Sequence, residues 1–301
     1  MRGSILRRAL APLLLLTLLP ITAIADDAHK EDVEKWYAGR IERLTSDTGY
    51  LSLVGLFELA PGDNRFGSGE ENELVFPGKA PGFAGTIHID SASIELTVAD
   101  GVTILHDETA VTSMKLHPDT SDKLTQLEMD SFVFYVIERA GKLYLRLKDR
   151  ESEALKNFKS IERYPVDEKW RVEAMFTPYD PPLPVRSPNF MGYEVEYPCP
   201  GELTFEIDGE EYKLEPLYRY EDEFFVVFGD ETSGIDTYGG GRFLYIPARE
   251  DAGIIVMDFN RSYNPPCVFT PFATCPLPRP SDVVPVPIEA GEKGYVTGPN
   301  H

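Results

Sequence analysis

The chain has 301 residues, and its 29 lysines and arginines against 50 aspartates and glutamates give a formal net charge of −21 at pH 7. So anionic a chain repels nucleic acid and anionic lipid, and we expect neither as a partner. Its length and its hydrophobic content of 42% suit one large domain or two smaller ones, whose core needs no metal or cofactor.

The first 25 residues are typical of a secretory signal peptide. Three arginines precede a short apolar run, and Ala23 and Ala25 supply small residues before a cleavage site at Asp26. The run is short for a bilayer span, although an uncleaved membrane anchor is the alternative. Cleavage would remove three arginines and no acid, changing the net charge from −21 to −24. We therefore expect an exported protein, periplasmic or secreted, with no membrane attachment after cleavage.

The mature chain is expected to open with one amphipathic helix over residues 26–47, which ends before Gly49. The apolar residues that recur at helical spacing are Val33, Trp36, Tyr37, Ile41 and Leu44. From Tyr50 onward the sequence predicts short strands separated by glycine, proline or aspartate.

A hairpin is predicted where residues 132–139 and 142–148 flank Ala140-Gly141. In its second strand three leucines alternate with Tyr144, Arg146 and Lys148. Because successive side chains of a strand point to opposite faces, this alternation predicts one buried face and one face in solvent.

The second half of the chain continues in strands. Asp208-Gly209 predicts a two-residue hairpin, and the unbroken apolar run Phe224–Phe228 predicts a strand buried on both faces. The proline-rich residues 178–188 predict a linker or an extended crossover. Overall we expect a mainly β fold of sandwich or barrel type, with a first domain over residues 48–160 and a second β-rich domain over residues 161–301.

Several long motifs resemble those of one family. They are Leu51–Leu56 with Pro61–Ser68, Asp230–Leu244, Asp258–Cys267, and Cys275–Pro278 with Ile288–Lys293. On these motifs the chain resembles the DUF1684 family, a bacterial and archaeal family of unknown function. The resemblance implies a shared fold and brings no established activity.

Residues 65–89 also resemble the start of a forkhead-associated (FHA) β-sandwich. Those domains bind phosphothreonine through an arginine, a serine and a histidine. Here Ser68 follows Gly67, and Ala80-Pro81-Gly82 stands where the second binding turn would be. The resemblance therefore implies an FHA-like sandwich without its phosphothreonine site.

Three cysteines in an exported chain allow one disulfide and leave one thiol over. Cys267 and Cys275 are close in sequence and flanked by prolines, so we pair them, which leaves Cys199 free and buried. A three-cysteine metal site is the alternative, but no metal-ligand spacing supports it and we predict none.

The candidate site comes from two polar segments rich in glycine or proline. The predicted ligand-binding residues are Asp230, Thr237, Tyr238, Arg242, Asp258, Asn260, Arg261, Tyr263 and Asn264. We expect Arg242, Asp258 and Tyr263 to converge on a pocket of the C-terminal domain that binds a small polar ligand, a sugar or a carboxylate, since arginine clamps carboxylates through its planar fork.

Two other interpretations stay open. In one, the protein is a periplasmic hydrolase in which Asp258, or the pair Glu289 and Glu292, supplies a catalytic acid–base. In the other, it is a structural or partner-binding module of the envelope: Arg242 pairs with Asp230 or Asp258, and residues 258–264 hold the C-terminus down. No nucleophile elbow, metalloprotease motif, P-loop or dinucleotide fingerprint is present.

Overall fold

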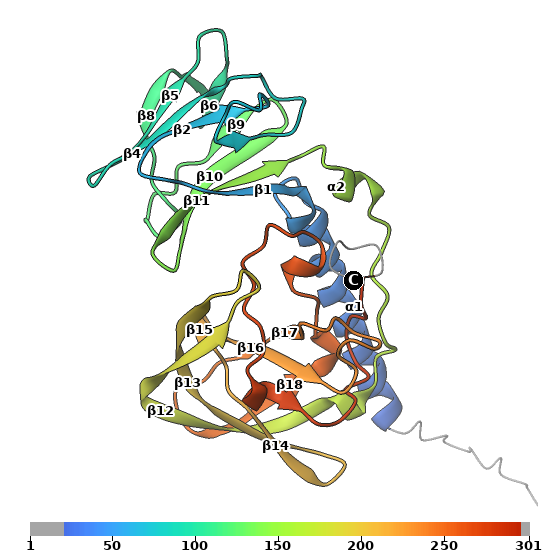
Figure 1. Cartoon of the computed structure of the whole chain (residues 1–301). Helices are drawn as coiled ribbons and strands as arrows, with labels where there is room; N and C mark the ends of the chain where they lie inside the picture. Colours follow the sequence, from blue (N-terminus) through green and yellow to red (C-terminus); the bar gives the residue numbers. More distant parts are fainter. Residues whose placement is uncertain (1–20, 296–301) are drawn as a thin grey trace, which may run out of the picture.

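The computed structural model describes residues 21–295, which form two lobes with a helix along one side (Figure 1). We call the lobe at the top of Figure 1 the upper lobe and the other the lower lobe. Residues 1–20, which carry most of the predicted signal peptide, lie outside the described residues. Within residues 21–295, none of the helices is long and apolar enough to cross a bilayer.

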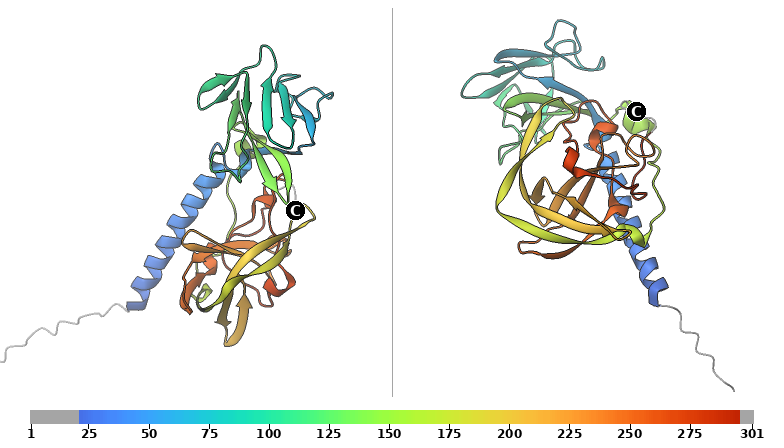
Figure 2. Two further views of the ribbon diagram at one scale, coloured as in Figure 1. Left: turned by 90° about the vertical axis from the view of Figure 1, so that its left-hand side faces the viewer. Right: turned by 60° about the horizontal axis from the view of Figure 1, so that its bottom comes forward.

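The N-terminal helix α1 (Ile21–Thr45) lies against the lower lobe and reaches toward the upper one (Figure 2). Val33 and Leu44 are buried, as their helical spacing predicts. His29 and Arg40 lie on the same stripe and are also sheltered from solvent. Two polar side chains on the packed face of a helix need partners, and α1 therefore carries more than apolar contacts.

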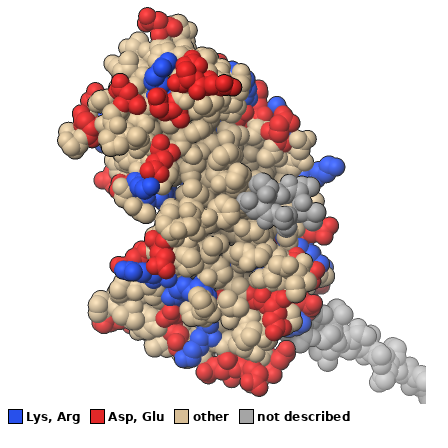
Figure 3. Space-filling view, viewed as in Figure 1, with Lys and Arg blue, Asp and Glu red and all other residues tan. Residues whose placement is uncertain are grey.

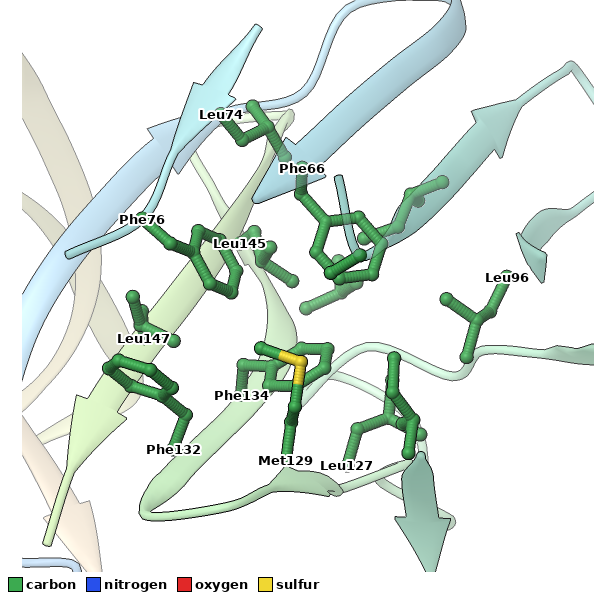
Figure 4. Packing of buried hydrophobic residues seen from close by; sticks show 14 of the residues in the cluster. Phe66, Leu74, Phe76, Leu96, Leu127, Met129, Phe132, Phe134, Leu145 and Leu147 are labelled. Carbon is green, nitrogen blue, oxygen red and sulfur yellow. The ribbon is translucent and has the colours of Figure 1, made fainter. Parts of the chain in front are cut away.

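Two sheets build the upper lobe. The first has the strand order β1 (Leu53–Glu58), β11 (Lys142–Asp149), β10 (Phe132–Arg139), β9 (Leu127–Met129), β6 (Ile104–His106) and β7 (Thr109–Val111). The second has the order β3 (Leu74–Val75), β2 (Gly62–Gly67), β4 (Gly85–Ile89), β5 (Ile94–Val98) and β8 (Ser113–Lys115). Apolar side chains from both sheets form one core, in which Phe66, Phe76 and Phe134 pack together (Figure 4). This two-sheet core is a β-sandwich.

The predicted hairpin of this domain is confirmed, because β10 and β11 pair antiparallel around Ala140-Gly141. The predicted solvent face of β11 is wrong for two residues, since Tyr144 and Arg146 are both buried. The leucines do point to the opposite face, as a strand requires. Arg146 is covered because it lines a cavity shared with the lower lobe.

The lower lobe also has two sheets around one core. One has the order β14 (Glu210–Leu214), β13 (Glu194–Ile207), β12 (Arg171–Pro188) and β18 (Gly253–Asp258). The other has the order β15 (Tyr218–Tyr220), β16 (Glu223–Asp230) and β17 (Arg242–Pro247), with β19 (Val283–Val284) parallel to β16. Strands of both sheets contribute to the core.

Strand β16 is buried on both faces, as its unbroken apolar run predicts. Phe224, Val226 and Phe228 belong to the core between the sheets, whereas Phe225 and Val227 pack in a third cluster with α1 and the C-terminal segments. The Asp208-Gly209 hairpin is confirmed between β13 and β14. Residues 178–188 are part of β12, with an irregularity after Pro178, and they pair with β13. The segment is extended, but it is a strand of a sheet, so the predicted linker or crossover is wrong.

The remaining elements are short. They are α2 (Glu153–Asn157) and the 3-10 helices η1 (Tyr50–Ser52), η2 (Glu168–Trp170), η3 (Phe259–Arg261), η4 (Pro266–Val268) and η5 (Pro280–Asp282). A mainly β fold with one long N-terminal helix is therefore confirmed.

Candidate functional site

The predicted site residue Arg242 is sealed inside the lower lobe, with no exposed surface. Its Nη2 lies 3.3 Å from Oδ1 of Asp230 and donates to the Ile288 carbonyl at 2.9 Å. Its Nη1 donates to the Ala290 carbonyl. Burial lowers the pKa of Arg242, and the charge of Asp230 acts against that shift. Arg242 therefore holds residues 288–290 in place and has no exposed surface through which to reach a ligand.

Asp230 is fully used by the same arrangement. Its Oδ2 accepts the Ile288 backbone N–H at 2.7 Å and the Thr232 hydroxyl at 2.9 Å. The Thr232 hydroxyl in turn lies 2.9 Å from the hydroxyl of Thr237. Tyr238 is buried, with its hydroxyl 3.8 Å from Sγ of Cys267. These polar groups are thus consumed by their neighbours.

Glu292 and Asn264 continue the arrangement toward α1. Oε2 of Glu292 accepts the backbone N–H of Asn264 at 2.7 Å, and Oε1 lies 3.4 Å from Nε of Arg40. Burial raises the pKa of Glu292, and the Arg40 charge opposes that shift. Gly291 has φ +72 and packs against the Ser262 carbonyl, where a Cβ would clash. We call the group Asp230, Thr232, Arg242, Asn264 and Glu292, with segment 288–293, the tail lock.

Asp258 and its neighbours fasten the start of α1. Oδ2 of Asp258 lies 2.8 Å from Nε2 of His29, whose Nδ1 lies 3.1 Å from Glu168. Asn260 donates to Oδ1 of Asp258 at 2.8 Å. Arg261 pairs with Asp258 at 3.6 Å and with Asp32 of α1. This cluster is a structural corner.

The expected convergence of Arg242, Asp258 and Tyr263 on one open pocket is therefore wrong. Arg242 is sealed and Asp258 is paired with α1, whereas Tyr263 lines a cavity elsewhere. Glu289 is exposed and Glu292 is buried, so these two carboxylates do not face each other across a cavity. The segments that are richest in polar residues build the fold because their partners lie within the protein.

A cavity of about 360 Å³ lies between the two lobes. Arg139 and Arg146 reach it from β10 and β11, Arg40 from α1 and Tyr50 from η1. The lower lobe supplies the other wall, formed by Tyr197, Tyr218, Phe225, Phe243, Tyr245, Tyr263, Pro266, Ala273, Thr274, Cys275 and Pro276. In Figure 3 the surface narrows between the lobes and carries few charged side chains there, while acidic side chains gather over both lobes. We call this cavity the interdomain cleft.

Arg146 stands out among the three arginines of the interdomain cleft. Arg40 is paired with Glu292, and Arg139 is paired with Asp119 at 2.7 Å. Arg146 is 8% exposed, its Nε has no hydrogen-bond partner, and no carboxylate of residues 21–295 pairs with it. Burying a charge without a partner is costly. An unpaired guanidinium beside a cavity is thus ready to receive an anion.

Four tyrosines lie in the facing wall and remain neutral. Burial raises the pKa of Tyr197 to about 12 and that of Tyr263 well above its usual value. Burial likewise raises the pKa values of Tyr218 and Tyr245. The phenols therefore keep their protons at neutral pH, and they can both stack on a ligand and hydrogen bond to it.

Cys275 lies at the edge of the interdomain cleft, next to Cys267. The backbone N–H of Cys267 donates to Sγ of Cys275 at 3.2 Å. The hydrogen bond to Cys275 lowers the pKa of Cys267, and burial raises the pKa of Cys275 well above its usual value. The structure of residues 21–295 contains no disulfide between them, so the predicted bond is not observed. Cys199 is buried, as predicted, and burial raises its pKa to about 11.

Sequence reasoning missed the cleft residues Arg40, Tyr50, Arg139 and Arg146. One signal was available for Arg40, which lies four residues from both Trp36 and Leu44 on the apolar stripe of α1. The alternation of β11 gave no such signal for Arg146, because a basic residue on the polar face of a strand is ordinary. Among residues 21–295, no group of three or more potential ligands could hold a metal ion.

The region of the chain that matches a known protein family includes the whole lower lobe. Residues 156–293 match the family model DUF1684, described as a protein of unknown function. This match supports the resemblance inferred from the C-terminal motifs, whereas the Leu51–Ser68 motifs lie outside it. The FHA-like resemblance is not confirmed. No curated protein matches the chain.

One solved structure similar to this chain is the solution NMR structure of an uncharacterized protein of Haloarcula marismortui. The two sequences are 29% identical, and the match covers 47% of this chain and 80% of that chain, with a TM-score of 0.40.

Proposed function

We propose that the protein binds a small organic anion in the interdomain cleft, with the negative group of the ligand on Arg146. The observation that carries this proposal is the unpaired, buried guanidinium of Arg146 at the wall of a cavity. An anion there would replace a missing partner. A carboxylate suits the site because its two oxygens match the planar fork of arginine.

The charge of the interdomain cleft favours a ligand with a single negative group. Carboxylates of the protein already pair with Arg40 and Arg139, which leaves one unpaired guanidinium. The protein as a whole carries a net charge of −21 and would repel a polyanion. The ligand therefore needs one anionic group and an otherwise neutral body.

The aromatic wall favours a sugar acid as that ligand. Four buried or half-buried tyrosines offer flat apolar faces and neutral hydroxyls, which suit the ring faces and hydroxyl groups of a sugar. The predicted sugar or carboxylate is kept in this proposal, and its site moves from the C-terminal domain to the cleft between the domains.

Binding without turnover fits the interdomain cleft better than hydrolysis. The side chains that line the 360 Å³ cavity include no aspartate, glutamate or histidine. Acid–base hydrolysis of a glycosidic bond relies on carboxylic groups that flank it. Asp258 and Glu292, the candidates for that role, are held in ion pairs with His29 and Arg40, and neither carboxylate lines the cavity.

Isothermal titration with glucuronate and with glucose tests the proposal. We expect glucuronate to bind and glucose to bind at least about tenfold more weakly, since a charged hydrogen bond contributes about 1.5–3 kcal/mol. Arg146→Gln should weaken glucuronate binding by a similar factor. Arg150→Gln is the matched control, because it removes one positive charge after the same strand, from a pair with Glu128.

The proposal fails if neither sugar binds, if glucose binds as tightly as glucuronate, or if Arg146→Gln and Arg150→Gln have the same effect. Export to the periplasm or the outside, the FHA-like first domain and a Cys267–Cys275 disulfide stay predictions that accompany it.

A further inference from the structure

A second and larger cavity adjoins the interdomain cleft. Its volume is about 1020 Å³, and it shares Arg40, Tyr50, Tyr245 and Tyr263 with the smaller cavity. Because four side chains line both, the two cavities are direct neighbours, and we describe them together as one groove. This groove runs from Arg146 along α1 toward Trp36 and Tyr220. Its total volume exceeds the usual range of about 300–1,000 Å³ for small-molecule pockets.

Aromatic rings follow one another through both cavities. The successive ring-centroid distances are 5.8 Å for Tyr197–Tyr218, 5.1 Å for Tyr218–Phe225, 4.9 Å for Phe225–Tyr245, 6.4 Å for Tyr245–Tyr263 and 6.2 Å for Tyr263–Trp36. Such a series offers repeated stacking surfaces. A ligand that uses all of it must be extended and must repeat a ring along its length.

Two tyrosines at the groove remain open to solvent. Tyr220 is 57% exposed and Tyr50 is 41% exposed, and both line the larger cavity. Exposed aromatic side chains that border a cavity indicate a binding surface. The rest of the rim is polar and mixed in charge, with Glu42, Arg43, Ser46, Thr48, Lys148 and Glu223. The polar rim can hydrogen bond to the hydroxyl groups of a chain of neutral sugars, and the aromatic floor can stack on their rings.

We infer that the ligand is a short saccharide chain with one acidic unit, which lies on Arg146 while neutral units extend over the aromatic series toward Trp36 and Tyr220. This inference rests on the proposed function and names its ligand class. A uniformly charged chain fits less well, because Glu42 and Glu223 balance Arg43 and Lys148 in the larger cavity and the protein as a whole is strongly anionic. A single-stranded nucleic acid has the same difficulty, with a phosphate at every unit.

Chain length is the variable that tests the inference. Glucuronate is compared with aldouronic acids of two to four units that carry one glucuronate, by titration calorimetry on the wild-type protein. We expect affinity to rise about tenfold or more from one unit to four, because each added ring finds a stacking partner. Xylotetraose, tetragalacturonate and a thymidine tetranucleotide are the comparison ligands, and each should bind more weakly than the four-unit aldouronic acid.

Tyr220→Ser locates the far end of the chain. This residue is exposed, so the variant should fold, and it should weaken the four-unit ligand several-fold while leaving glucuronate unchanged. Phe83→Ser is the matched control, since Phe83 is 40% exposed on the upper lobe and lines neither cavity. The chain has two tryptophans, so Trp170→Phe leaves Trp36, in the groove, as the one tryptophan whose emission can be excited selectively at the red edge. Its emission should change with the longer ligands.

The outcomes separate the two proposals. If glucuronate binds but affinity does not grow with length, or if Tyr220→Ser behaves like Phe83→Ser, the extended chain is wrong and the anion site stands. If xylotetraose, tetragalacturonate or the tetranucleotide binds as tightly as the four-unit aldouronic acid, the chain with one acidic unit is wrong. If no saccharide binds, both proposals fail.

Discussion

Two buried arginines of this protein differ in whether other residues pair with them. Arg242 has no exposed surface, and Asp230 and the carbonyls of Ala290 and Ile288 surround its guanidinium. Arg146 is 8% exposed and has no such partner among the described residues. The fold depends on a paired buried charge, because removing one partner leaves the other charge buried and uncompensated. An unpaired buried charge can instead gain its partner from a ligand. Whether the protein itself supplies a partner for the guanidinium, and not how deeply it is buried, distinguishes the structural arginine from the candidate binding arginine.

The largest expected effect is on Arg242. Arg242→Gln leaves Asp230 buried without its counter-charge and frees two backbone carbonyls of the tail lock. We expect the free energy of unfolding to fall by about 3–5 kcal/mol, the usual cost of removing one partner of a buried pair. Urea denaturation measures it, with exposed Arg186→Gln as the control. A loss below about 1 kcal/mol would show that the tail lock does not depend on this pair.

A smaller effect of opposite sign is expected for Arg146. Arg146→Met keeps the unbranched stem of the side chain and removes an unpaired charge, so the free energy of unfolding should rise by about 1 kcal/mol while anion binding is lost. Arg279→Met is the matched comparison. Arg279 is 9% exposed and paired with Asp282 at 2.6 Å, so its loss should destabilise the protein. Equal destabilisation by both variants would mean that Arg146 supports the fold.

The smallest effect concerns the tyrosines of the interdomain cleft. Their folded-state pKa values are raised above 10, so above pH 10 the unfolded chain releases phenolic protons that the folded protein retains. The free energy of unfolding should therefore fall as the pH rises beyond 10, and ligand affinity should stay constant from pH 7 to about 9.5. Absorbance at 295 nm and calorimetry at each pH measure both. Weaker binding below pH 9 would show that a phenol ionises early.

Much of the fold could be predicted because it depends on local pattern. The Ala140-Gly141 and Asp208-Gly209 hairpins, the doubly buried strand at Phe224–Phe228 and the α1 stripe all follow from neighbouring residues. The prediction of a linker or crossover over residues 178–188 was wrong because it gave the prolines more weight than cross-strand pairing. The pairing with β13 resumes at Leu183, so β12 continues past its irregularity after Pro178.

The candidate site could not be predicted in the same way. Arg242 finds its partners 46 and 48 residues further along the chain, and Asp258 finds His29 at a separation of 229 residues. Composition identified these residues as polar and clustered, but only the fold shows that they satisfy one another. The interdomain cleft has the opposite problem, since Arg146 looks like an ordinary surface residue until a second lobe covers it.

The walls of the groove come from two lobes: β10 and β11 pack in the core of the upper lobe, and the aromatic wall packs in the third cluster, with α1 and the C-terminal segments. The recognition surface therefore exists only while both lobes are intact. Heating the protein should therefore abolish ligand capture at the melting transition of whichever lobe gives way first, even if the other still keeps its native structure. The temperature at which binding is lost is therefore the melting temperature of the less stable lobe. A saturating ligand should raise the melting temperatures of both lobes together.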